Sequence, residues 1–211
     1  MKQKIEKILL NTTDLFQKYG IKSLTMSDIA RLNMVSKKTL YNYVSDKAEL
    51  VELVLQHFFA VIYDKINQES SKAQNAIEEM LYIQKQLVEV VKNHNYSVEF
   101  DLRKYYPLLY DKMNLDKSRQ LYKEMKENIE RGQSEGLYRQ EVDADLIAKS
   151  RVIFQTQRID NEFVSFKEFA NVRALKHMME YHMRAICTEE GLKVLTQLIK
   201  EFNNENCDHE N

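Results

Sequence analysis

The chain has 211 residues, of which 44% are hydrophobic and 30% are charged, a balance typical of a soluble globular protein with one or two domains. Its longest apolar run, Phe58 to Tyr63, is far too short for a membrane span of about 20 residues. Two cysteines, Cys187 and Cys207, make neither a disulfide framework nor a zinc pattern. These features exclude a membrane protein and a disulfide-rich secreted domain, and we expect a cytoplasmic protein with reduced thiols.

Charge is distributed unevenly along the chain although the net charge is only −1. Residues 1–50 contain nine Lys or Arg and five Asp or Glu, whereas the remaining residues contain 22 and 27. A mildly basic N-terminal part on an acidic body is compatible with nucleic-acid binding by that part.

Three short helices are predicted in the first 45 residues. The first has an apolar stripe that ends at Gly20, a residue typical of helix C-termini. The stripe consists of Ile5, Ile8, Leu9, Thr12, Leu15, Phe16 and Tyr19. Thr25 or Ser27 can cap a second helix that runs to about Asn33, and Ser36 can cap a third that ends near Val44.

A fourth helix is predicted after Ser45 and Asp46, with Glu49 at the spacing of a capping box from Asp46. Apolar residues cover more than one of its faces, so we expect it to be buried on several sides. Further helices are predicted over residues 73–94, 98–113, 115–135, 143–165, 166–188 and 189–204. Pro107 should break or kink one of them, and Gly132 and Gly136 should end another. No stretch shows strand periodicity, and only four Gly and one Pro interrupt the chain, so the predicted fold class is all-α.

The second and third helices have the combined length of a helix-turn-helix. On a helical wheel, Leu40 and Val44 fall on one side of the third helix and should face the core. The other positions carry donors and aromatic rings: Lys38, Thr39 and Asn42 point away from the core, Lys37 and Tyr41 lie on one flank, and Tyr43 lies on the other. This arrangement suits a helix in the major groove, whose tip meets base edges and whose flanks meet phosphates.

Each polar residue of the third helix has a possible role on DNA. Lys38 can donate to guanine, Asn42 can pair with adenine, and the Thr39 methyl can meet a thymine methyl. The predicted backbone contacts are Thr25, Ser27, Lys37, Tyr41, Tyr43 and Lys47. Taken singly, each lysine is more simply explained as a solvated charge, and Tyr41 and Tyr43 are explained as packing on the first helix. The joint pattern is more specific than its parts.

The segment FQKYGIKSLTMSDIARLNMVSKKTLYNYVSDKAEL resembles the N-terminal domain of the tetracycline-repressor (TetR) family of bacterial regulators. The matching residues are Phe16, Gly20, Thr25, Asp28, Ile29, Ala30, Val35, Ser36, Thr39, Leu40, Tyr41, Lys47 and Leu50. The resemblance covers about residues 5–55. It implies an all-helical homodimer in which each subunit has a DNA-reading head and a larger helical body that binds a ligand. We accordingly predict a DNA-binding domain at residues 1–46 and a ligand-binding and dimerisation domain at residues 47–211.

One residue of the predicted turn departs from the family pattern. The family usually has Gly where this chain has Met34, and Gly is favoured where φ is positive. The turn is therefore expected to be strained or shifted by one residue. This departure leaves open a rival hypothesis, a helical binding or scaffolding protein whose head no longer binds DNA.

The body offers aromatic and basic candidates for a small-molecule pocket. Two segments, YSVEFDLRKYYPLLYDKM and NIERGQSEGLYRQEVDADLIAKS, resemble a subgroup of TetR regulators whose ligands are mostly unassigned. The candidate ligand-binding residues are Phe100, Arg103, Tyr106, Tyr110, Tyr122, Phe154 and Arg158, and they would suit a hydrophobic or aromatic small molecule. Core packing and surface ion pairs are the simpler explanations for each of them. The predicted helices over 143–165 and 166–188 are our candidates for the dimer interface.

Catalytic and metal-binding patterns are missing from the sequence. His177 and His182 are five residues apart, which places them on different helix faces, and no phosphate loop, nucleophile elbow or zinc-protease motif occurs. We therefore expect no enzymatic activity, no metal and no cofactor. The predicted function is a ligand-responsive regulator, most simply a repressor, that binds near-palindromic double-stranded DNA as a homodimer.

Overall fold

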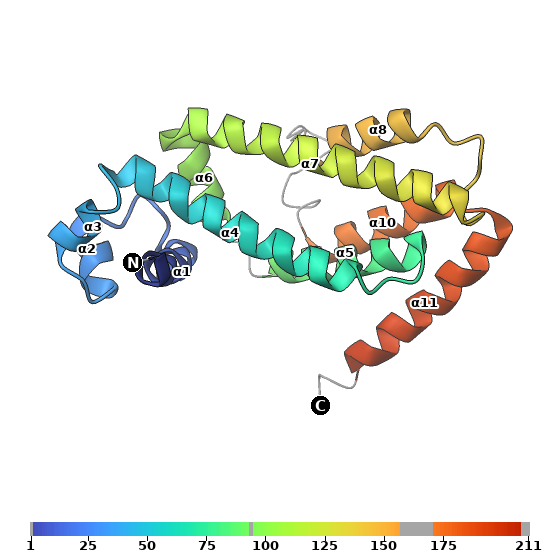
Figure 1. The fold of residues 1–211 in the computed structure, drawn as a ribbon, viewed down its shortest axis with the longest axis horizontal. Helices are drawn as coiled ribbons and strands as arrows, with labels where there is room; N and C mark the ends of the chain where they lie inside the picture. The colour runs from blue at the N-terminus through green and yellow to red at the C-terminus, as the bar shows by residue number, and fades with distance from the viewer. Residues whose placement is uncertain (1, 93–94, 157–170, 208–211) are drawn as a thin grey trace. The chain divides into compact units, whose positions relative to one another are not determined.

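The structure is a computed structural model that describes residues 2–92, 95–156 and 171–207, and these residues are almost entirely helical (Figure 1). The helices are α1 (Lys2–Tyr19), α2 (Met26–Leu32), α3 (Lys37–Tyr41), α4 (Lys47–Ser70), α5 (Ala76–Lys92), α6 (Tyr96–Tyr105), α7 (Pro107–Ser134), α8 (Ala144–Thr156), α10 (Val172–Ile186) and α11 (Glu189–Cys207). A single isolated β-bridge joins Tyr138 and Cys187 within this part of the chain. The all-α prediction is confirmed. None of the described helices has the length and apolar character that crossing a membrane requires.

The chain divides into two compact units. Residues 1–64 and 93–114 form the first unit, and residues 65–92 and 115–211 form the second. The first unit extends past the predicted boundary at residue 46, because α4 and α6 contribute to the core beneath the first three helices. The assignment of DNA binding to residues 1–46 and of ligand binding to residues 47–211 stays a prediction.

Local capping chemistry defines the helix ends of the first unit. The Thr25 hydroxyl accepts a hydrogen bond from Asp28 N, and the Asp28 carboxylate accepts one from Thr25 N, so α2 begins with a capping box. Thr25 rather than Ser27 is therefore the cap. Gly20 follows α1 with a φ of +79°, as the C-terminal position requires. At the start of α4, Glu49 N donates to Asp46 Oδ1 over 2.8 Å, as predicted, but the Glu49 carboxylate accepts from Ser45 N rather than from Asp46 N.

Pro107 separates α6 from α7, and this corrects the predicted boundaries. Proline has no N–H, which makes it compatible with the first position of a helix, and α7 begins at Pro107 itself. The predicted break near residue 114 does not exist, since α7 continues to Ser134. Gly132 lies inside α7, contrary to the prediction that it helps to end the helix, whereas Gly136 follows the end with a φ of +73°.

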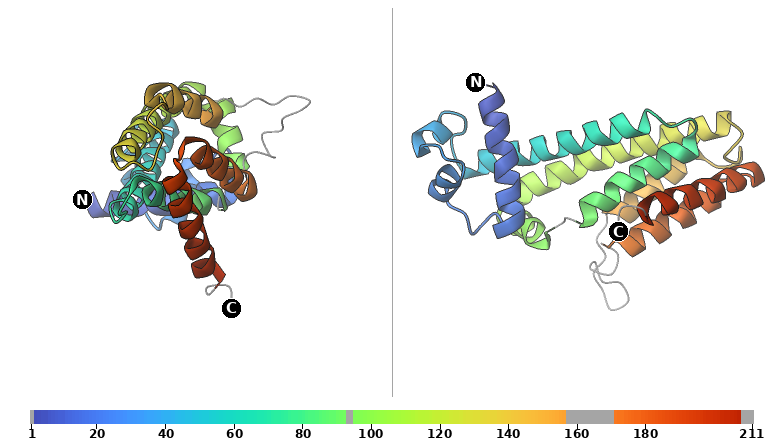
Figure 2. Two further views of the ribbon diagram at one scale, coloured as in Figure 1. Left: turned by 90° about the vertical axis from the view of Figure 1, so that its right-hand side faces the viewer. Right: turned by 90° about the horizontal axis from the view of Figure 1, so that it is seen from below.

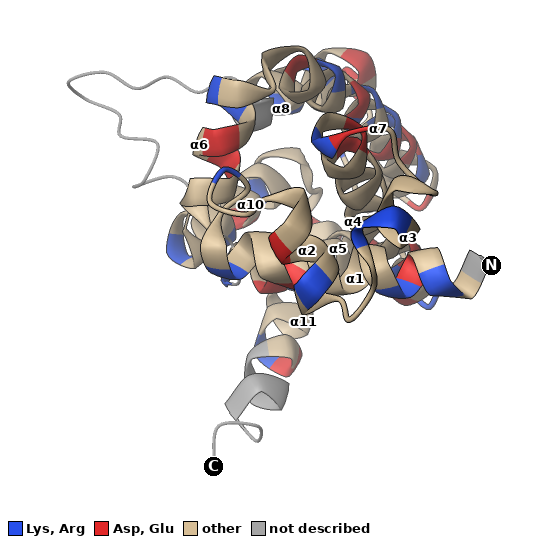
Figure 3. Ribbon diagram, turned by 90° about the vertical axis from the view of Figure 1, so that its left-hand side faces the viewer, with Lys and Arg blue, Asp and Glu red and all other residues tan. Residues whose placement is uncertain are grey.

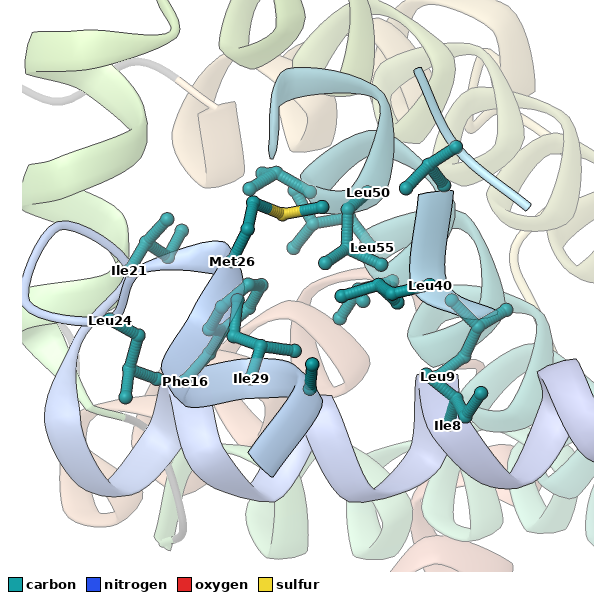
Figure 4. Packing of buried hydrophobic residues seen from close by; sticks show 14 of the residues in the cluster. Ile8, Leu9, Phe16, Ile21, Leu24, Met26, Ile29, Leu40, Leu50 and Leu55 are labelled. Atoms are coloured by element: carbon teal, nitrogen blue, oxygen red, sulfur yellow. The ribbon is translucent and has the colours of Figure 1, made fainter. Parts of the chain in front are cut away.

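The core of the first unit draws on α1 to α4 and α6 (Figure 4). Its buried members are Ile8, Leu9, Phe16, Ile21, Leu24, Met26, Ile29, Ala30, Leu40, Val44, Leu50, Val51, Val54, Leu55, Val98 and Leu102. Leu40 and Val44 are buried as predicted. Tyr19, the last residue of the predicted stripe, is instead 47% exposed because the chain turns away at Gly20.

In the second unit, α5 packs against α10 and α11 (Figure 2). Tyr138, in the segment after α7, is fully buried in its core. The Tyr138 hydroxyl donates to Asn128 Oδ1 over 3.2 Å, and Asn128 Nδ2 donates to Ala76 O over 2.9 Å. Burial, followed by the charges around the ring, raises the pKa of Tyr138, so the phenol stays protonated and keeps donating. This buried chain of hydrogen bonds ties α5 to α7.

The Tyr138 ring occupies the space that a side chain at Gly132 would fill. A Cβ atom at Gly132 would lie 2.0 Å from Tyr138 Cδ2, so the ring would have to leave its position. We predict that Gly132→Ala destabilises the protein by about 3 kcal/mol or more, through overpacking and loss of the buried phenol contact. Chemical denaturation measures this loss in the free energy of unfolding.

Gly136→Ala is the matched control. A Cβ there meets nothing within 4 Å, so the substitution adds only the strain of a side chain at positive φ, about 1–2 kcal/mol. Equal losses for the two variants would contradict the steric explanation at Gly132.

Candidate nucleic-acid interface

Helices α2 and α3 are joined by a tight turn that is held by backbone hydrogen bonds. Val35 N donates to Ala30 O, and Met34 N donates to Arg31 O, each over 3.0 Å. This pair of bonds is the Schellman motif, which requires a left-handed residue just past the helix end. Met34 occupies that position with a φ of +56°. The turn is therefore strained rather than shifted, because Met34 stands where glycine is favoured.

The exposed side of α3 carries the predicted base-reading residues. Ser36 caps the helix by accepting from Thr39 N over 3.0 Å, and Leu40 is completely buried, which fixes the rotation of the helix. Lys38 and Asn42 are consequently exposed. Thr39 is partly exposed, and its hydroxyl lies 2.8 Å from Ser36 Oγ. All three predicted residues thus share the outward side of one short, well-capped helix.

The flanks of α3 carry a lysine and two tyrosines. Lys37 is exposed, and its Nζ lies 5.8 Å from the centre of the Tyr41 ring, itself 43% exposed. Tyr43 is partly buried and packs against the core of the first unit. Figure 3 shows blue Lys and Arg segments on α1, α2 and α3, with red Asp and Glu segments among them on α1 and α2. On α3 itself the charged residues are Lys37 and Lys38, so its exposed surface is positively charged.

Lys47 differs from the sequence interpretation. Its Nζ donates to the carbonyl oxygen of Ile21 over 2.7 Å, and the side chain is partly buried. Burial lowers the pKa of Lys47, and the nearby Asp101 carboxylate opposes that shift. The ammonium group therefore holds the segment between α1 and α2 onto the start of α4. In this conformation it does not project outward as a phosphate contact would.

Thr25 and Ser27 lie at the start of α2. The Thr25 hydroxyl is engaged with Asp28, to which it donates over 2.6 Å while accepting from Asp28 N. Ser27 is exposed in the first turn of α2. Ser27 is the less restricted of the two as a hydrogen-bond donor to a phosphate.

Helix α6 anchors the first unit through residues that the sequence interpretation missed. Asp101 Oδ2 accepts from Lys22 N over 2.7 Å, and Lys22 Nζ lies 2.5 Å from the Tyr105 hydroxyl. Asn95, the cap of α6, donates from its backbone N to Gln17 Oε1 over 3.1 Å and from Nδ2 to the Gln17 carbonyl oxygen. Partners about 80 residues apart leave no local signal in the sequence.

Residues 8–54 match a family model described as bacterial regulatory proteins, tetR family. Residues 8–54 are therefore a TetR-family N-terminal domain. The matched residues contain α2, α3 and the beginning of α4, where the interface described above lies. No curated protein matches the sequence significantly.

Solved structures that include a TetR transcription regulator share the fold of most of the chain. A TetR transcription regulator from Haloarcula marismortui has 16% identity and a TM-score of 0.72, with 89% of this chain and 100% of that chain covered. A transcriptional regulator from Saccharomonospora viridis in complex with choline has 16% identity and a TM-score of 0.66, with 90% and 100% covered. AibR, in complex with isovaleryl coenzyme A and operator DNA, has 16% identity and a TM-score of 0.50, with 82% and 94% covered.

The predicted ligand-binding residues divide between the two units and the residues outside the described part of the chain. Phe100 and Arg103 are exposed on α6, and Tyr106 and Tyr110 pack against the first core. Tyr122 and Phe154 belong to the second unit, while Arg158 lies outside the described residues. Tyr122 is occupied by a 2.6 Å hydrogen bond to Asp145, and Phe154 is 70% exposed. The set stays a prediction.

Among the residues that the structure describes, no three His, Cys, Asp or Glu side chains come together as a metal site would need. Cys187 is a buried free thiol, and burial raises its pKa to about 11. This thiol is therefore protonated and unreactive at neutral pH.

The strained backbone at Met34 leads to a prediction about protein stability. The side chain is 94% exposed, so removing it loses no packing, while glycine relieves the left-handed conformation. Met34→Gly should raise the free energy of unfolding by about 1 kcal/mol, measured by chemical denaturation. Met34→Ala keeps the strain and should be nearly neutral. Equal effects of the two substitutions would show that the left-handed conformation costs nothing here.

Proposed function

We propose that this TetR-family regulator binds a near-palindromic DNA duplex as a homodimer, represses transcription, and changes its DNA affinity when its body binds a small molecule. The AibR complex contains both a ligand and operator DNA, and the Saccharomonospora viridis regulator binds choline, so proteins of this fold combine the two activities. A cytoplasmic location belongs to the same proposal. The strained turn at Met34 is the main observation in favour of the scaffolding alternative.

The observation that carries the proposal is the rotation of α3. Leu40 is completely buried, so Lys38 and Asn42 are turned outward. We assign Lys38 to guanine acceptors and Asn42 to adenine, contacts that each discriminate by about 1–3 kcal/mol. The Thr39 hydroxyl is held near Ser36, which leaves the Thr39 methyl as its contact for thymine.

Phosphate contacts would flank this helix. We assign Lys37 and Tyr41 to one strand, and Tyr43, Thr25 and Ser27 to further backbone contacts that position the head without reading sequence. Lys47 is not retained among them, because its Nζ already donates to Ile21 O.

The function is tested by selecting bound fragments from random DNA and titrating the selected site at several salt concentrations. A two-fold symmetric dimer should select inverted half-sites whose centres lie about 34–36 Å apart, or a multiple of that distance. Affinity should fall steeply as salt rises, because each phosphate contact releases counterions. Failure to enrich any inverted repeat, together with binding that is insensitive to salt, would reject DNA recognition and favour a scaffold.

Two lysines should respond differently in that titration. Lys37→Ala should flatten the dependence of log affinity on log salt by about one, since it removes one phosphate contact. Lys47→Ala should leave the slope unchanged but lower protein stability by about 1 kcal/mol, through loss of the hydrogen bond to Ile21. Lys123→Ala, an exposed lysine of the second unit, is the control that should change neither quantity. A flatter slope for Lys47→Ala would restore it as a phosphate contact.

An apolar stripe on α8 supports the proposed dimer interface. Leu146, Ile153 and Phe154 are 62%, 52% and 70% exposed and are spaced seven and eight residues apart, which places them on one helix face. On α10, Tyr181 is 73% exposed. Exposed apolar residues gathered on one face mark a surface that a partner covers. Both helices fall within the predicted seam over residues 143–165 and 166–188.

Leu146→Glu should weaken dimerisation by about 100-fold or more, because two-fold symmetry removes one buried leucine from each copy, worth about 1.5–3 kcal/mol apiece. Sedimentation equilibrium measures the change. Leu108→Glu, at an 85% exposed leucine of α7, is the matched control and should leave the dimer intact. Equal dimer affinities for the two variants would move the interface away from α8.

A further inference from the structure

A buried arginine without an acidic partner lies in the second unit. Arg151, on α8, is only 6% exposed. Within the described part of the chain, its Nε has no hydrogen-bond partner, and the one hydrogen bond of its side chain is the contact of Nη2 with Met179 Sδ at 3.9 Å. A thioether sulfur is a weak acceptor, so most of the donor capacity of this guanidinium is unused.

His182 lies on α10, three residues after Met179, and is near enough to Arg151 to be affected by its charge. Its Nε2 is buried and also has no hydrogen-bond partner. Burial, followed by the positive charge of Arg151, lowers the pKa of His182 to about 4. The imidazole is therefore neutral at pH 7, and the pair carries one positive charge that no described carboxylate contacts.

This arrangement is costly for the protein by itself. Burying an unpaired charge or an unsatisfied donor opposes folding, and buried arginines are normally paired with acids. Among the described residues, the printed contact of Arg151 is with Met179, which is a buried apolar residue of the same core as Met183 and does not compensate the charge. Two unsatisfied groups on two helices, oriented so that one shifts the pKa of the other, indicate that an anion from outside completes the site.

We propose that Arg151 and His182 bind the carboxylate of a small hydrophobic acid, with the side chains of Met179 and Met183 beside its apolar part. The inference rests on the proposed ligand-responsive function and names the class of ligand. A guanidinium presents two parallel N–H donors that match the two oxygens of a carboxylate. The carboxylate would replace the weak contact between Arg151 and Met179.

The charge balance favours a carboxylate over a phosphate. A carboxylate carries one negative charge and neutralises Arg151 alone. A phosphate monoester carries about −1.5 to −2 at pH 7 and would leave negative charge buried next to a neutral imidazole. The buried thioethers suit an apolar chain or ring, since methionine adapts to irregular apolar shapes.

Calorimetric titration of the full-length protein without DNA tests the assignment. The probes are hexanoate, decanoate and benzoate, with hexanamide as the uncharged counterpart of hexanoate and inorganic phosphate as the competing anion. We expect at least one carboxylate to bind, and hexanamide and phosphate to bind at least about tenfold more weakly, because a hydrogen bond to a charged group is lost or mismatched. Binding of none of the three carboxylates, or tighter binding of phosphate, would overturn the proposal.

Arg151→Met separates a ligand-binding role from a structural one. Removal of an unpaired buried charge should raise the thermal midpoint of the free protein while the carboxylate affinity falls at least about tenfold. Arg151→Lys keeps the positive charge but loses the planar guanidinium, so it should also bind the carboxylate at least about tenfold more weakly. This second variant keeps the test decisive if Arg151→Met folds poorly. Arg119→Met, at a side chain that is 70% exposed in the same unit, is the control for the substitution itself.

Unchanged carboxylate affinity in both Arg151 variants, or a lower thermal midpoint for Arg151→Met, would show that the guanidinium has a structural role instead. DNA binding is measured separately on a selected site. Loss of carboxylate binding with intact DNA binding would therefore contradict only the ligand assignment, whereas carboxylate binding that never alters DNA affinity would contradict the proposed regulation.

Discussion

Burial of Leu40 is the constraint on which the DNA-reading surface depends. Helix α3 has only five residues, too few to be stable alone, because helix nucleation is unfavourable and each added residue contributes little. Its orientation is therefore set by one side chain in the core and one capping hydroxyl, that of Ser36. Lys38 and Asn42 point outward as a consequence. Residues at the surface thus owe their positions to an apolar contact beneath them.

Two hydrogen bonds extend this constraint to the longer helices of the first unit. The segment after α1 is held at Ile21 O by Lys47, the first residue of α4, and at Lys22 N by Asp101 of α6. Both bonds involve a charged group, which makes each stronger than a neutral hydrogen bond. A displacement of the start of α4 or of α6 must therefore break one of these bonds or move the segment that leads into α2. The first unit consequently contains a physical connection between its long helices and its DNA-reading pair.

The features that sequence could predict are those encoded within a few residues. Gly20, the Ser36 cap and the inward position of Leu40 follow from local spacing, and the structure has all three. Contacts between distant residues were not predictable: Lys47 reads as an exposed lysine because its acceptor is 26 positions away, and Asp101 lies 79 positions from Lys22. The ligand candidates stay a prediction for the same reason, since residue type alone does not determine which aromatic side chains converge.

Met34 and Arg151 both break a local rule, but their costs differ in kind. The strain at Met34 lies on an exposed turn and belongs to the backbone, so any residue except glycine would share most of it. Arg151 is buried, and its cost depends on what occupies its surroundings. The unpaired charge of Arg151 raises the free energy of the ligand-free protein. A bound anion would remove this cost, so the same contacts would give a more favourable binding free energy here than at a site without an unpaired charge. That difference is why Arg151, and not Met34, indicates a ligand.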